Sequence, residues 1–191
     1  MKQVVVVAGP AGSGKDSIIR EILRRYRKAA FLINATTRAP RSGEVDGVNY
    51  YFFTNEEFLR EVAKGTIPEH YHRVETDTYY GTYKPDLNKK LAEGKMAFTQ
   101  IQIVGAKYLK EHYNATTFFI MPPGPDAFEK RVRARASMSD AEWQERVAFT
   151  NREIEQEAPW YDYRIHNEDG KLQEAADEVV AILTKEGYTL E

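Results

Sequence analysis

The chain has no cysteine, which excludes a disulfide framework, a thiol nucleophile and a thiolate metal site. Positive and negative charges are also nearly balanced. The formal net charge is −2 over 191 residues, so no broad basic field attracts nucleic acid or an anionic membrane. No apolar run approaches the length of a membrane span. The length instead suits one domain with a well-developed core.

The strongest positive signal is a glycine-rich loop between an apolar run at 4–8 and an amphipathic stretch that begins near residue 15. Its spacing, two glycines five apart and then lysine, is the P-loop pattern. Glycines let backbone N–H groups face phosphate oxygens, the helix N-terminus adds its positive dipole end, and the lysine places a charge on the β- and γ-phosphates. The predicted phosphate-binding residues are Gly9, Pro10, Ala11, Gly12, Ser13, Gly14, Lys15, Asp16 and Ser17.

Asp16 stands where a serine or threonine normally offers a hydroxyl to Mg²⁺, and the hydroxyl comes one residue later, at Ser17. Two interpretations of Asp16 stay open. It is either a favourable charge in the first helical turn or part of the shell that holds the metal.

Strand-like and helical stretches alternate along the chain, which predicts an α/β fold. This alternation, with the P-loop, predicts a P-loop NTPase core: a central parallel sheet flanked by helices. The predicted strands are 3–8, 29–35, 96–103, 115–121 and 161–166. The predicted helices are 15–27, 84–93, 104–112, 124–136, 140–157 and 171–186, with a short further helix from residue 54 and a capping box at Ser139–Glu142.

Two segments read as insertions into one domain, whose core is expected at about 1–33, 84–123 and 158–191. Residues 34–83 are rich in arginine, tyrosine, glycine and threonine, and are expected to form an acceptor-binding lobe. Residues 124–157 carry arginines on two helices and are expected to form a lid. Phosphoryl transfer between two nucleotides needs such an arrangement, because closure excludes the water that would otherwise take the phosphoryl group.

The run from Thr37 to Gly47 contains two arginines three apart, Arg38 and Arg41, fixed by a proline and able to clamp a phosphate dianion. Over essentially the whole chain, the sequence resembles the guanylate kinase family. The resemblance rests on this run together with the P-loop, the run Tyr79-Tyr80-Gly81-Thr82, the pair Pro122-Pro123 and the run Tyr161-Asp162-Tyr163. The resemblance implies ATP, Mg²⁺ and a nucleoside monophosphate acceptor, most simply GMP or dGMP, and a cytoplasmic location.

The resemblance also implies roles, position by position. Arg38, Arg41, Tyr50 and Tyr80 match residues that hold the acceptor's phosphate, while Glu69 and Thr82 match two residues that read guanine. The lid arginines Arg135 and Arg146 match residues that reach the transferring phosphoryl group, and Arg131 lies one helical turn before Arg135.

The chain departs from the family's pattern at three places. Glutamines replace two acids of the family: Gln100 at a position linked to Mg²⁺, and Gln102 at a position linked to the base. In addition, Asn34 stands where a serine is usual. An amide lacks the charge assistance of a carboxylate and is also a usual partner of adenine, although both glutamines could instead bond neighbouring side chains. The stretch after Glu69 is two residues longer than usual, which makes Glu75 a rival base reader.

His70 and His72 would share a face of a strand, and we expect them to line a pocket or the surface rather than bind metal. Two further functions stay open beside nucleotide phosphorylation. The run Gly14-Lys15-Asp16-Ser17 is similar to the loop of ribose 1,5-bisphosphate phosphokinase, which needs no base-reading acids. A non-catalytic, peptide-binding guanylate-kinase-like module is the other, although such modules usually have degraded P-loops.

Overall fold

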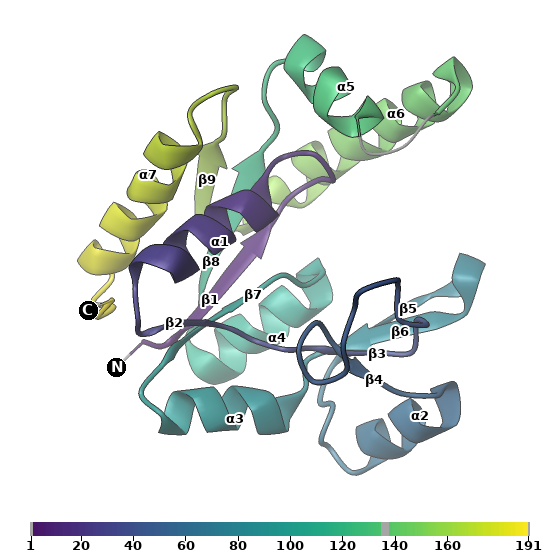
Figure 1. Ribbon diagram of the computed structural model, residues 1–191, viewed down its shortest axis with the longest axis vertical. Helices are drawn as coiled ribbons and strands as arrows, with labels where there is room; N and C mark the ends of the chain where they lie inside the picture. The colour runs from purple at the N-terminus through teal and green to yellow at the C-terminus, as the bar shows by residue number, and fades with distance from the viewer. Residues whose placement is uncertain (1, 135–137, 191) are drawn as a thin grey trace.

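The computed structural model describes residues 2–134 and 138–190. Its centre is a five-stranded sheet in the order β2-β7-β1-β8-β9, in which every pair is parallel (Figure 1). The strands are β1 (Val4–Ala8), β2 (Ala29–Phe31), β7 (Met96–Thr99), β8 (Thr116–Met121) and β9 (Tyr163–His166). The predicted α/β class is therefore confirmed.

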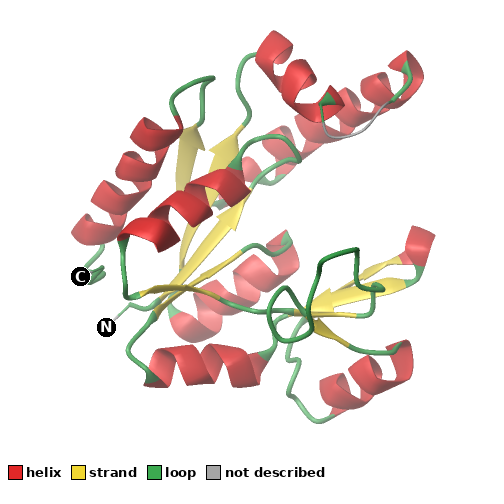
Figure 2. Ribbon diagram, in the orientation of Figure 1, coloured by secondary structure: helices red, strands yellow, loops and turns green. Residues whose placement is uncertain are grey.

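Helices cover both faces of this sheet (Figure 2). Successive side chains of a strand point to opposite faces, so Val5 and Val7 of β1 pack with one helical layer and Val4 and Val6 with the other. A parallel strand covered on both faces needs a continuous apolar sequence, which explains the valine run. The first layer holds α1 (Lys15–Arg25) and α7 (Leu172–Lys185), and the second holds α3 (Lys84–Ala92) and α4 (Ile103–Tyr113).

A second, smaller sheet lies beside the carboxyl ends of the central strands (Figure 1). Its order is β4-β3-β6-β5, and its strands are β3 (Ala35–Thr36), β4 (Tyr51–Phe52), β5 (His70–Arg73) and β6 (Thr78–Gly81). Helix α2 (Asn55–Ala63) packs on this sheet through the buried Phe58, and a capping box between Thr54 and Glu57 fixes its start. A short 3₁₀ turn, η1 (Val74–Thr76), forms the tip between β5 and β6.

Two helices, α5 (Pro125–Arg133) and α6 (Asp140–Gln156), lie on the other side of the carboxyl ends of the central strands (Figure 1). Phe128, Val132 and Trp143 form a small apolar cluster between them. The predicted capping box is present at the start of α6, where Ser139 accepts from the Glu142 amide and the Glu142 carboxylate accepts from Ser139. A second 3₁₀ turn, η2 (Ala158–Trp160), leads back to β9.

Several predicted boundaries are wrong. Strand β2 ends at Phe31, and the predicted strand 96–103 ends at Thr99 because the backbone turns there and α4 begins at Ile103. The alternation Gln100-Ile101-Gln102-Ile103 has the period of a strand but belongs to a loop and a helix start. Strand β5 lay outside the predicted elements. No helix within the described ranges is both long and apolar enough to cross a bilayer.

Candidate active site

The loop after β1 has the backbone of a phosphate cradle. Gly9 and Gly14 have φ of 137° and 89°, where a side chain is strained. The neighbouring atoms also leave no room for a side chain at either position. A Cβ on Gly9 would lie 2.5 Å from the Ile120 carbonyl oxygen, and a Cβ on Gly14 would lie 2.1 Å from Asn167 Nδ2. Helix α1 begins at Lys15 without a side-chain cap, so its first amides face the loop. These features fit the oxygens of an anionic phosphate chain.

Asn167 holds the loop in place. It is 3% exposed, and its Nδ2 donates to the Ser13 carbonyl oxygen at 2.7 Å. Lys15 Nζ donates to the Pro10 carbonyl oxygen at 3.3 Å, which folds the lysine over the loop. The sequence analysis missed Asn167 because it comes 154 residues after Ser13 and no local pattern links the two.

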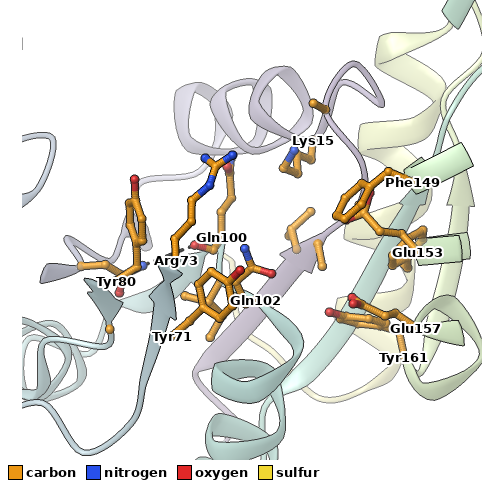
Figure 3. Close-up of a pocket in the computed structure, with 18 of the residues that line it drawn as sticks. Lys15, Tyr71, Arg73, Tyr80, Gln100, Gln102, Phe149, Glu153, Glu157 and Tyr161 are labelled. Carbon is orange, nitrogen blue, oxygen red and sulfur yellow. Dashed lines mark hydrogen bonds between the residues drawn. The ribbon is translucent and has the colours of Figure 1, made fainter. Parts of the chain in front are cut away.

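A cavity of about 620 Å³ opens beside this loop (Figure 3). Its walls come from the loop, from β5 and β6, from residues 100–102 and from α6. Of the predicted phosphate-loop residues in the described chain, Gly9, Ala11 and Lys15 line it, whereas Asp16 and Ser17 lie in the first turn of α1 outside the lining. Of the predicted acceptor residues, Asn34, Tyr50, Glu69, Tyr80, Gln100 and Gln102 line it.

Glu69, directly before β5, lines the cavity from the side of the second sheet. It accepts from the Thr82 amide at 2.9 Å, and a Cβ on Gly105 would lie 2.8 Å from its carboxylate. Burial raises the pKa of Glu69, and the hydrogen bonds from Thr82 oppose that shift. The rival acid, Glu75, also lines the cavity but sits in η1, exposed and 3.9 Å from Arg73. The structure thus places Glu69, not Glu75, against Thr82.

Asn34 presents an acceptor to the cavity. Its side chain is 6% exposed, and its Nδ2 donates to Thr99 Oγ1 at 2.9 Å and to the Gln100 carbonyl oxygen at 3.4 Å. This orientation leaves Oδ1 buried with no hydrogen-bond partner among the described residues. A polar ligand group that donates would satisfy it.

Arg38 is held by an acid that the sequence analysis left without a role. Its Nη2 lies 3.0 and 2.9 Å from the two carboxylate oxygens of Glu44, and its guanidinium lies 5.6 Å from the ring centroid of Tyr50. The Arg41 amide donates to Glu44 at 2.7 Å, and this bond, with the Arg38 guanidinium, lowers the pKa of Glu44. Arg38 and Arg41 themselves lie outside the cavity lining.

The two described arginines of the predicted lid, Arg131 and Arg146, have different surroundings. Arg131 bonds Asp169 at 3.1 Å and the carbonyl oxygens of Asn167 and Glu168, beside Gly14. Arg146 instead lines the cavity from α6. Arg135 lies outside the described residues. His70 and His72 share a face of β5, as predicted; this partly exposed face packs on Phe58 and Tyr79 and does not line the cavity.

Glu153 of α6 is an acid on the wall nearest to Lys15. Burial and the neighbouring Glu157 raise its pKa to about 7, and the charges of Lys15 and Arg146 act in the opposite direction. The sequence analysis missed it because its pKa depends on burial in the folded chain and on Lys15, which is far away in the sequence. Its proton occupancy therefore changes near neutral pH.

Glu153→Gln is expected to raise the midpoint of thermal unfolding at pH 8 by about 2–4 °C, equivalent to about 1 kcal/mol in a domain of this size. The folded-state pKa lies above the usual 4.5, so the native state binds the extra proton and stability falls as pH rises from 4.5 through 7. Solvent around this half-buried group reduces the effect below the full value of the shift.

At pH 4, below the pKa of Glu153 in both the folded and the unfolded state, the effect of the raised pKa is absent and the change in unfolding temperature should be much smaller. The control is Glu155→Gln, an exposed acid on the same helix. An equal shift for Glu153→Gln at both pH values would contradict the assignment of a raised pKa.

The parallel sheet, the phosphate loop after β1 and the cavity between two flanking units define a P-loop kinase of nucleoside monophosphates. Comparisons with known proteins agree with this class. The family model "Guanylate kinase" matches residues 1–186. The chain belongs to the guanylate kinase family.

Individual relatives cover nearly the whole chain. A guanylate kinase of Synechocystis sp. is 35% identical over 185 residues, which are 96% of this chain and 94% of the relative. One from Clostridioides difficile is 36% identical and covers 96% of this chain and 87% of its own. The crystal structure of guanylate kinase from Anaplasma phagocytophilum superimposes with a TM-score of 0.74 at 28% identity, over 98% of this chain and 87% of that chain.

Proposed function

We propose that the protein transfers the γ-phosphoryl group of ATP to a nucleoside monophosphate, with GMP or dGMP as the acceptor. One observation carries the proposal: a single cavity is lined both by Lys15 of the phosphate loop and by Glu69 and Gln102. A donor phosphate chain on the loop and an acceptor base at Glu69 would face each other across it. The names of the relatives support guanine as the base.

In this proposal the protein positions and neutralises charge rather than forming a covalent bond. An oxygen of the acceptor phosphate attacks the γ-phosphorus, the bond to the β–γ bridging oxygen breaks, and ADP leaves. The acceptor oxygen is already ionised, so no side chain has to remove a proton. Lys15 and Arg146 would offset the charge on the transferring group, and Arg38, Arg41, Tyr50 and Tyr80 would hold the acceptor phosphate.

Mg²⁺, when bound, would offset the negative charge of the donor phosphates. It keeps several waters and needs few protein ligands, which fits this site: no three His, Asp or Glu side chains cluster for a metal within 2–134 and 138–190. We expect Ser17 and Asp16 at the start of α1, and Gln100 on the cavity wall, to hold it mostly through water.

Steady-state assays with ATP, Mg²⁺ and a panel of acceptors test the proposal directly. The panel contains GMP, dGMP, AMP, UMP, CMP and ribose 1,5-bisphosphate. Transfer to GMP and dGMP above the other acceptors is the expected result. Preference for the sugar phosphate would support the alternative kinase, which the loss of both acids at Gln100 and Gln102 favours. No transfer to any acceptor would contradict the proposal.

Gln102→Asp is expected to raise kcat/KM for GMP relative to AMP by about 10-fold or more, since a hydrogen bond to a charged group is worth about 1.5–3 kcal/mol. A carboxylate accepts hydrogen bonds from the N1–H and N2–H₂ groups of guanine with the assistance of its negative charge. The oxygen of an amide also accepts, but it is uncharged. The control is Gln144→Asp on an exposed turn of α6. An unchanged acceptor profile would show that residue 102 does not read the base.

A further inference from the structure

Strand β5 presents alternate side chains to the cavity. Glu69, Tyr71 and Arg73 line it, and so does Glu75 in the turn that follows. The residues between them, His70 and His72, face Phe58 and Tyr79 on the other side of the sheet. This period of two is that of a strand with one face on a site and one on a core.

Arg73 contributes a positive charge to a cavity that has few. Among the described residues, the cations that line the cavity are Lys15, Arg73 and Arg146. The other two come from the phosphate loop and from α6, so Arg73 supplies the charge from the side of the second sheet. In Figure 3 the Arg73 side chain reaches toward the same end of the cavity as Lys15, while Tyr71 and Gln102 lie lower in the view.

The backbone that carries Arg73 is well anchored. His72 stacks on Tyr79, with ring centroids 4.1 Å apart and an interplanar angle of 8°, and its Nε2 lies 2.8 Å from Asp77 Oδ1. Asn55 of α2 donates to the other oxygen of Asp77 at 3.0 Å. These contacts use the face of the hairpin opposite to the cavity, so they fix the strand and leave the Arg73 side chain on the site.

Competing partners of Arg73 are weak. Its Nε lies 3.9 Å from Glu75 Oε2, and both side chains are largely exposed, at 57% and 78%. An exposed pair of this kind contributes little and yields readily to a phosphate dianion, which binds guanidinium through two parallel hydrogen bonds. The Cα of Arg73 lies about 13 Å along the strand from that of Glu69, so the two side chains face different parts of a bound nucleotide.

We propose that Arg73 is a catalytic residue that contacts the phosphoryl group passed between the two nucleotides. This inference rests on the proposed phosphotransfer. With Lys15 and Arg146, Arg73 would surround the transferring group from three elements, which suits a loose transition state whose charge is spread over three equatorial oxygens.

Arg73→Ala is expected to lower kcat with ATP and GMP by about 10- to 100-fold, in line with the loss of one charge-assisted hydrogen bond. Arg73→Lys keeps the charge but loses the planar fork, so it should recover part of the rate. The matched control is Arg60→Ala: Arg60 has a similar exposure of 59% and a similar ion pair with Glu56, but lies on α2 away from the cavity.

Two readouts separate this role from others. The fractional loss of kcat should be the same with GMP, dGMP and any other accepted nucleotide, since phosphate and not base is contacted. Calorimetry should show weaker binding of a bisubstrate analogue, two nucleosides joined by a polyphosphate, but unchanged binding of guanosine. A loss that depends on the base, a rise in KM for GMP with unchanged kcat, or kinetics equal to those of Arg60→Ala would overturn the inference.

The calorimetric arm also keeps this inference distinct from the proposed function. If the wild type transferred phosphoryl to no acceptor, the proposed function would fail. Unchanged affinity of Arg73→Ala for the bisubstrate analogue would then independently overturn the role of Arg73.

Discussion

Lys15→Ala is expected to lower kcat/KM for phosphoryl transfer by about 10²–10³-fold, the usual cost of removing one preorganised group that offsets developing charge. The lysine lies over the phosphate loop, and its Nζ contacts the Pro10 carbonyl oxygen rather than the hydrophobic core. The free energy of unfolding should therefore change little. The two quantities are measured by steady-state kinetics and by urea denaturation.

The control for this variant is Lys89→Ala, an exposed lysine on α3. It removes the same side chain and charge away from the cavity. Rates within twofold of the wild type for Lys15→Ala would contradict the phosphate-loop assignment, and a large loss of stability would show that the lysine also supports the fold.

Gly105→Ala is expected to lower kcat/KM for the acceptor by about 10- to 100-fold, the cost of losing hydrogen bonds to a charged group. The added Cβ would lie 2.8 and 2.9 Å from the Glu69 carboxylate oxygens and 2.8 Å from Ile101 Cδ1. Glu69 would have to move away from Thr82. Alanine itself favours a helix by about 1 kcal/mol over glycine, so damage to α4 would not explain the loss.

A double variant tests whether Gly105 acts through Glu69. If it does, Gly105→Ala should add little to the loss already caused by Glu69→Gln, because coupled sites are not additive. Affinity for ATP should stay at the wild-type value in all three proteins. Fully additive losses, or a weakened ATP dependence, would contradict the proposed link.

The sequence predicted the phosphate loop well because its chemistry is local. Glycines with positive φ, a helix start and a lysine come within seven residues, and physical constraints on each are independent of the rest of the fold. The valine run of β1 was equally clear, since burial on both faces leaves no polar position. Such features specify their own structure.

Features built from distant segments could not be predicted in this way. Nothing near Asn167 in the sequence indicates that it would bond the Ser13 carbonyl oxygen, 154 residues earlier. Glu153 reads as one more acid on a charged helix, because its raised pKa comes first from burial, which only the folded chain provides. The alternation of glutamine and isoleucine at 100–103 led to a wrong prediction of a strand for a related reason. These residues have the period of a strand, but the side chains at 100–102 line the cavity.

Gly12 of the phosphate loop lies directly beneath α5, where an added Cβ would come 2.7 Å from Val132 and 3.2 Å from Phe128. Two apolar side chains of α5 therefore cover the Gly12 side of the loop, while Gly9, Ala11 and Lys15 face the open cavity. An outward swing of α5 would uncover Gly12. We expect this contact to limit the access of water to that side of the loop and so to reduce wasteful hydrolysis of ATP.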